Sequence, residues 1–182
     1  ENPVSQLGTE LLSPKTKAWL KENLKKLETI YDPDVTLNKK ADGYCGIWYQ
    51  CGTTPGEYVY KYSGGLGTYC AKHRPFAVYC SKVDKTFFCY GGAKPENNQA
   101  LLHMVSYYDH KTGMVPRPTI LLDKKTSDAH DNPVISVDDE GYIWIFSTAH
   151  GTPRPSYIHK STSPYSIDKF DLIRPDIKRF EN

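Results

Sequence analysis

The chain lacks several features that would assign it to a broad class. No apolar run within its 182 residues approaches the length needed to cross a bilayer. The net charge is only +2 and no basic block exceeds a few residues, which argues against a nucleic-acid partner. The five cysteines include no Cys-x-x-Cys pair, which argues against a zinc site. We therefore expect a globular protein with no membrane span and no nucleic-acid partner.

Two further absences concern processing and cross-linking. The chain starts at Glu1, with no initiator methionine and no signal peptide, so we expect either a removed leader or an excised segment. Cys80 and Cys89 would face each other in a hairpin that turns at Asp84-Lys85. A disulfide and two free thiols both stay open there, and buried free thiols are favoured because cysteine packs as a small hydrophobic residue.

Aromatic residues are abundant. Fourteen Tyr, six Phe and three Trp make up 13% of the chain. Tyrosine and tryptophan suit surfaces that stack on sugar rings while offering a polar group, and they also pack well in β-strands. Both interpretations are compatible with a strand-rich protein that contacts a glycan.

The N-terminal part predicts one helix. Ser13-Pro14 is a typical helix start, and Leu24, Leu27 and Tyr31 recur at helical spacing. We expect an amphipathic helix over about 14–31 within a lead-in segment of residues 1–42. From residue 43 onward the pattern changes to short strands, so residues 43–182 form the second predicted segment.

The most informative stretch is a predicted hairpin with a histidine just outside each end. Residues 134–137 form a short apolar run, 138–141 supply a turn, and 142–146 are aromatic and β-branched. Because the strands are antiparallel, their outer ends lie side by side, so His130 and His150 are expected at one edge of the sheet. The neighbouring polar residues are Asp128, Asp131, Asn132 and Arg154.

A similar plan occurs earlier in the chain. Residues 73–92 contain a His before a Pro, a strand, a polar turn, an aromatic strand and a Gly, and Pro75 precedes Pro133 by 58 residues. A second strand pair is expected after each hairpin, at 102–108 with 119–122 and at 156–160 with 170–173. Four strands per unit at this period predict a mainly β fold made of propeller blades. The strand-like segments 44–50 and 57–62 fit the outer half of another blade.

Two to three blades do not close a ring, since propellers use about four or more. We therefore expect a partial propeller, incomplete without further blades. Missing blades, or self-association with other chains, would cover the open sheet edges.

The hairpin motif resembles the BNR-repeat-containing family of sialidase-like and ulvan-lyase-like propellers. The similarity covers roughly residues 68–173. It is carried by residues 128–133, 138–143, His150-Gly151 and 155–161, and by His73-Arg74-Pro75, which is similar to the family's first-blade motif.

The resemblance implies a propeller of about seven blades in secreted or periplasmic bacterial proteins that act on carbohydrates. Some members of the family are polysaccharide lyases acting on uronic-acid-containing polymers such as ulvan, and others are described as glycoside hydrolases. In the lyases the two histidines of this hairpin lie in the active-site cleft, which implies catalytic roles for His130 and His150. The Tyr and Arg that later blades contribute to the lyase site have no counterpart in this chain.

A lyase mechanism gives each candidate a role. Either His130 or His150 would be the base and the other the acid, since imidazole transfers protons near neutrality. Arg74 or Arg154 would pair with a uronate carboxylate as a bidentate fork. The other predicted substrate-side residues are His73, Asp131, which would orient an imidazole, and Asn132, which would bond a sugar hydroxyl.

Other functions stay open. One is a non-catalytic propeller that binds polysaccharide or oligosaccharide. Another is a sialidase-like glycoside hydrolase, although Asp128 and Asp131 lie on one loop and are poorly placed to straddle a glycosidic bond. No cofactor is predicted, and a structural metal ion held by the histidines is the third interpretation. His103, His110 and His159 are expected to be structural or surface residues.

Overall fold

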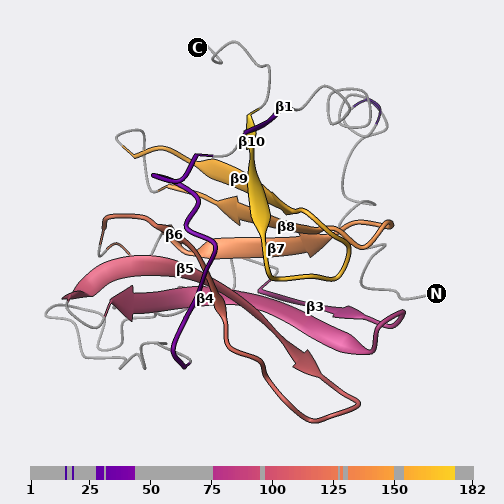
Figure 1. Ribbon diagram of the computed structural model, residues 1–182. Coiled ribbons are helices and arrows are strands. Elements are labelled where there is room, and N and C mark those ends of the chain that lie inside the picture. Colours follow the sequence, from indigo (N-terminus) through magenta and orange to yellow (C-terminus); the bar gives the residue numbers. More distant parts are fainter. Residues whose placement is uncertain are drawn as a thin grey trace, which may run out of the picture. The chain divides into compact units, whose positions relative to one another are not determined.

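The structure is a computed structural model that describes residues 15, 18, 28–30, 32–43, 76–94, 97–126, 128, 131–149 and 154–174 (Figure 1). The chain divides into two compact units. One comprises residues 1–30 and 173–182, and the other comprises residues 31–172. The candidate site residues that the structure describes all belong to the second unit.

The first sheet is a run of four consecutive antiparallel strands with one added strand. The four are β3 (Ala77–Cys80), β4 (Lys85–Lys94), β5 (Asn97–Asp109) and β6 (Thr119–Asp123). The short strand β2 (Lys39–Lys40) pairs with β6, so the order is β2-β6-β5-β4-β3. This pairing covers an edge of β6 that would otherwise expose its backbone groups.

The second sheet repeats this plan. Its consecutive strands are β7 (Pro133–Val137), β8 (Ile143–Ser147), β9 (Tyr157–Ser161) and β10 (Phe170–Arg174). The strand order is β1-β10-β9-β8-β7. β1 (Glu28–Ile30) belongs to the small unit, together with the last two residues of β10.

The predicted four-strand repeat is confirmed. Each sheet contains one hairpin followed by a second strand pair, and the second pairs fall on the segments that the sequence indicates. The described part of the chain is mainly β, in antiparallel units of the kind predicted for propeller blades. The strands predicted at 44–50 and 57–62 lie outside the described residues.

The predicted helix over 14–31 is wrong at its C-terminal end. Lys15 and Ala18 are helical, but Glu28–Ile30 form β1. Thr29 and Ile30 are β-branched, and strand pairing outweighs the helical spacing of Leu27 and Tyr31 there. The rest of the predicted helix lies outside the described residues. Within the range described, no helix has the length and apolar character that crossing a bilayer demands.

The β4–β5 hairpin is longer than predicted. β4 continues through Gly91 and Gly92 to Lys94, and β5 begins at Asn97, five residues before the expected start. Both glycines are buried and pair with His103 and Leu102 of β5. They therefore extend the strand, whereas the sequence pattern suggested a strand end.

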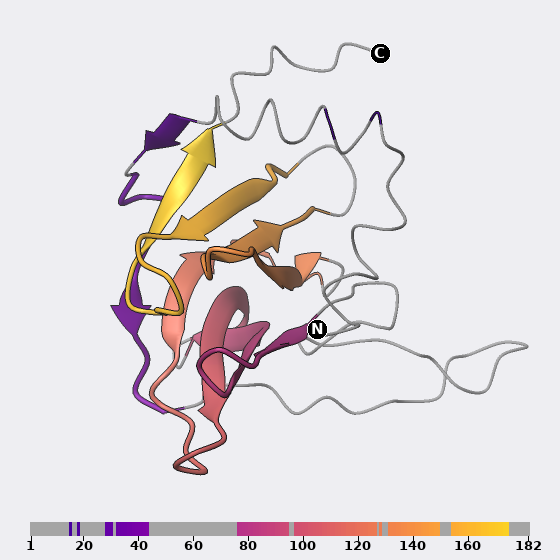
Figure 2. The ribbon, with the colours of Figure 1, turned by 90° about the vertical axis from the view of Figure 1, so that its right-hand side faces the viewer.

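A hydrophobic core fills the space between the two sheets, which lie one above the other in Figure 2. β3 and β4 both contact β7. In β8, Ile143 and Ile145 are fully buried while Trp144 and Phe146 are only partly so, which is the alternation of a strand with one face on the core. The fully buried side chains of this core are Phe87, Val105, Leu121, Ile135, Ile143, Ile145 and Phe170.

Both described cysteines are free thiols, as favoured above. The β3–β4 turn occupies residues 81–84, so Cys80 pairs with Lys85 and not with Cys89. The Cys89 thiol donates to the carbonyl of Pro133 at 3.5 Å, which links β4 to the first residue of β7. Burial raises the pKa of the Cys89 thiol, so the group stays protonated.

The β7–β8 turn has the predicted position and is held by one side chain. Asp138 accepts from the backbone N–H of Tyr142 at 2.8 Å and from the indole N–H of Trp144 at 2.8 Å. Gly141 has a φ of +91° and donates its N–H to the Asp138 carbonyl. Its carbonyl accepts from the backbone N–H of Tyr165, whose ring lies against the glycine.

Replacing Gly141 with alanine tests this packing. The new Cβ would overlap the Tyr165 ring and also adopt a strained positive φ, so we expect a loss of about 2–4 kcal/mol in unfolding free energy, measured by urea denaturation. Gly43→Ala is the matched control, because Gly43 has a φ of +93° but open space around it, and should lose only about 1 kcal/mol. Equal losses in the two variants would show that Tyr165 does not constrain the turn.

Candidate functional site

The open end of the β7–β8 hairpin is the candidate site. Pro133 of β7 pairs directly with Ser147 of β8, so the chain enters and leaves the hairpin side by side. This register confirms the predicted hairpin. His130 and His150, each three residues beyond this pair in sequence, lie outside the described residues, as do His73 and Arg74.

Asp131 is the most constrained residue at this end. It is completely buried, and its backbone N–H donates to the Asp128 carbonyl at 3.1 Å. Arg154 donates from Nε to Oδ2 at 2.8 Å and from Nη2 to Oδ1 at 2.9 Å. This is a two-pronged pairing of guanidinium with carboxylate, the strongest of the common side-chain ion pairs.

Arg154 also contacts a second carboxylate. Its Nη2 donates to Oδ2 of Asp128 at 2.8 Å. The hydrogen bonds to Asp131 raise the pKa of the Arg154 guanidinium further above its ordinary value. The sequence predicted that these three residues lie close together, and the structure shows how they meet.

Lys124, the residue after β6, is the fourth charged side chain at this end of the hairpin. Its Nζ lies 3.5 Å from Oδ2 of Asp131 and donates to the Pro155 carbonyl at 2.8 Å. Its side chain is only 1% exposed. Burial lowers the Lys124 pKa, and attraction by Asp131 opposes that shift. The four side chains therefore balance two positive charges against two negative ones.

His103 of β5 reaches this group from the first sheet. Its Nε2 lies 2.7 Å from the Asp131 carbonyl oxygen, and its Nδ1 lies 2.8 Å from Oγ of Ser147. Burial, assisted by the positive charge of Lys124, lowers the pKa of His103 to about 3. The ring is therefore neutral at physiological pH.

His159 of β9 is a second buried imidazole. Its Nε2 lies 2.9 Å from Oγ1 of Thr36, and burial lowers its pKa to about 4. It pairs across the strands with Ile145 of β8. The expectation that His103 and His159 are structural residues agrees with their complete burial.

The three described substrate-side candidates differ in accessibility. Asp131 and Asn132 are 0% and 1% exposed, whereas the Arg154 side chain is 29% exposed. Sequence reasoning identified all three but missed Lys124, His103 and Ser147. Lys124 lies beside Lys125 in a polar loop, and His103 interrupts an apolar strand, so neither carries a local signal of its partner.

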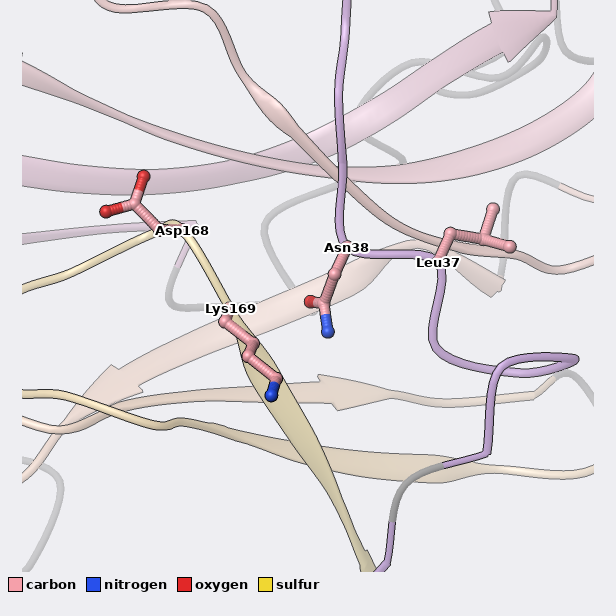
Figure 3. Close-up of a pocket in the computed structure, with 4 residues that line it drawn as sticks. All are labelled: Leu37, Asn38, Asp168 and Lys169. Carbon is pink, nitrogen blue, oxygen red and sulfur yellow. The ribbon is translucent and has the colours of Figure 1, made fainter.

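A shallow pocket lies elsewhere, lined by Leu37, Asn38, Asp168 and Lys169 (Figure 3). Asn38 donates to the Phe170 carbonyl and accepts from its N–H, both at 2.9 Å. Asp168 pairs with Lys40 at 3.0 Å. The hydrogen bonds of Asn38 connect the segment before β2 to β10. Across the residues described, no three His, Cys, Asp or Glu side chains gather as a metal site would require.

Comparisons with known proteins give two partial likenesses. No family model and no curated protein matches the chain. Two solved structures are similar: that of a new family of polysaccharide lyase, an ulvan lyase, and that of the ulvan lyase bound to a glucuronic acid–rhamnose 3-sulfate saccharide. Both are 22% identical with a TM-score of 0.46, and cover 61% and 60% of this chain. The chain spans 29% and 28% of their lengths.

The two buried imidazoles should make the stability of the fold sensitive to acid. Their pKa values fall from 6.5 to about 3 for His103 and about 4 for His159, so the unfolded chain binds more protons than the folded one below pH 6.5. The stability that the two neutral rings contribute is fully present above that pH. It should fall on acidification, each ring contributing up to about 1.4 kcal/mol per pH unit. Urea unfolding between about pH 7 and pH 5 measures this slope.

Single replacements separate the two contributions. His103→Gln and His159→Gln should each remove about half of the slope in that window, whatever their effect at neutral pH. A slope that stays at its wild-type value in both variants would mean that neither ring is kept neutral by the fold.

Proposed function

We propose that this chain is part of a carbohydrate-active protein that binds a uronic-acid-containing polysaccharide and cleaves it by β-elimination. His130 and His150 transfer the protons in this proposal. The observation that carries it is the paired opening of the β7–β8 hairpin, with Asp131 anchored beside it.

The hairpin geometry supports the pairing of the two histidines. His130 directly precedes Asp131, so their Cα atoms are about 3.8 Å apart along the chain. His150 follows Ser147 by three residues, and Ser147 pairs with Pro133. Arg154, four residues beyond His150, contacts Asp131 at 2.8 Å. Described residues on either side of the two histidines are therefore connected, Pro133 with Ser147 and Asp131 with Arg154.

Imidazole chemistry suits the reaction. One histidine takes the proton from the carbon next to the uronate carboxylate. The released electron pair forms a carbon–carbon double bond as the bond to the leaving sugar oxygen breaks, and the other histidine protonates that oxygen. Imidazole is effective in both roles because its pKa lies near neutrality.

We assign Arg154 and Asp131 to positioning and not to direct substrate contact. Two nitrogens of Arg154 donate to Asp131 and Asp128, and both carboxylate oxygens of Asp131 accept from it or from Lys124. Neutralising the uronate then falls to Arg74 among the predicted residues. Asn132 is buried as well, so we do not assign it to direct substrate contact either.

The placement of Asp128 and Asp131 makes a glycosidase less suitable. Asp131 has no exposed surface, and Asp128 and Asp131 bind the same Nη2 of Arg154. A glycosidase needs two carboxylates placed across an accessible bond. Non-catalytic glycan binding remains the second candidate, because the same hairpin opening would serve a binding protein equally well.

Ultraviolet absorbance of the unsaturated product tests the proposal directly. The natural protein that contains this chain, incubated with uronate polysaccharides including ulvan, should release product at a measurable rate. His130→Ala and His150→Ala should each lower kcat by about 100-fold or more, since each removes a proton-transfer group. His110→Ala, in the exposed turn after β5, is the control and should keep wild-type kcat.

Binding without product would replace the lyase with the second candidate. Full activity in both His130→Ala and His150→Ala would remove their catalytic roles even if the protein were a lyase.

A further inference from the structure

His103 connects the first sheet to the open end of the β7–β8 hairpin, where the chain enters β7 and leaves β8. It lies on β5 between Leu102 and Met104 and is completely buried. Its two ring nitrogens contact Asp131, two residues before β7, and Ser147, the last residue of β8. One side chain of the first sheet thus holds the entry and the exit of the hairpin in the second.

The partners fix the tautomer of this ring. The Asp131 carbonyl can only accept, so Nε2 carries the proton and donates to it. In the neutral ring Nδ1 then has no proton and accepts from the Ser147 hydroxyl. The titratable groups around the ring are Lys124, the residue after β6, His159 on β9 and Asp131. The charge of Lys124 opposes protonation of the ring more strongly than the neutral His159 does, and the carboxylate of Asp131 favours it.

An apolar side chain would not replace these bonds. Leucine at position 103 would fill similar space but would leave the Asp131 carbonyl and the Ser147 hydroxyl buried with one partner fewer. The contacts are also specific in direction, since one nitrogen donates and the other accepts. A residue that only filled the core at position 103 would not need to form these two hydrogen bonds.

We infer that His103 is a positioning residue, which fixes the relative placement of the segments that carry His130 and His150. This inference rests on the proposed function for its catalytic meaning. Reacting groups must be held to within fractions of an ångström, and a shift of about 1 Å can lower a rate 100-fold. His103 constrains the backbone next to His130 and the strand end that leads to His150.

Three replacements separate the two bonds. In His103→Gln the amide nitrogen can still donate to Asp131, in His103→Asn the amide oxygen can still accept from Ser147, and His103→Leu removes both. With a uronate polysaccharide, His103→Leu should lower kcat by at least about tenfold with KM within about twofold. The glutamine and asparagine variants should fall between it and wild type.

His159→Leu is the matched control. His159 is equally buried, on β9 of the other sheet, but its hydrogen bond goes to Thr36 and not to the hairpin ends. It should lose stability as His103→Leu does yet keep wild-type kcat at temperatures where both variants are folded. Equal kcat values for the two leucine variants would reduce His103 to a core residue and overturn the inference.

Amide hydrogen exchange gives a readout that needs no activity. Exchange at Asp131, Ile135 and Ser147 should be at least about tenfold faster in His103→Leu than in His159→Leu. If the wild-type protein makes no product but exchange rises in this way, the proposed function fails and the positioning of the hairpin ends stands. Equal exchange in both variants would overturn the positioning itself.

Discussion

The pairing of Asp131 with Arg154 is the interaction on which the candidate site depends. Asp131 is fully buried, and a buried carboxylate is stable only when charge and hydrogen bonds compensate for its lost hydration. Arg154 supplies two hydrogen bonds, Lys124 supplies a second positive charge, and Asp128 balances the group. The pair joins the loop before β7 to the loop before β9.

A second set of contacts brings the other sheet to the same place. The backbone of Asp131 is bonded by His103 of β5, and Pro133 by the thiol of Cys89 in β4. The side chain of Asp131 is therefore fixed within its own sheet and its backbone is fixed by the neighbouring one. Anchoring from two directions is the rigidity that two proton-transfer groups would require.

Local sequence patterns predicted the parts of this arrangement that depend on near neighbours. The Asp138–Gly141 turn, the position of β8 and the four-strand repeat all follow from spacing and turn chemistry. The proximity of Asp131 to Arg154 followed from treating the hairpin as antiparallel. The end of the N-terminal helix was wrong because β1 forms by pairing with β10, a partner distant in sequence.

The contacts of Lys124, His103 and Ser147 could not be predicted for the same reason. His103 has ordinary apolar neighbours, and its partners are 28 and 44 residues away. Only the packing of one sheet on the other brings them together. The sequence therefore identified the carboxylates and the arginine, while the residues that hold them in place emerged from long-range packing.

A double-mutant cycle on Asp131→Asn and Arg154→Leu measures the central interaction most directly. Unfolding free energies of the wild type, both single variants and the double variant give the coupling between the two side chains. We predict a coupling of about 2–3 kcal/mol, well above that of a parallel cycle on Arg154 and Asp128, whose carboxylate is partly exposed. Additive losses, with a coupling below about 0.5 kcal/mol, would contradict it.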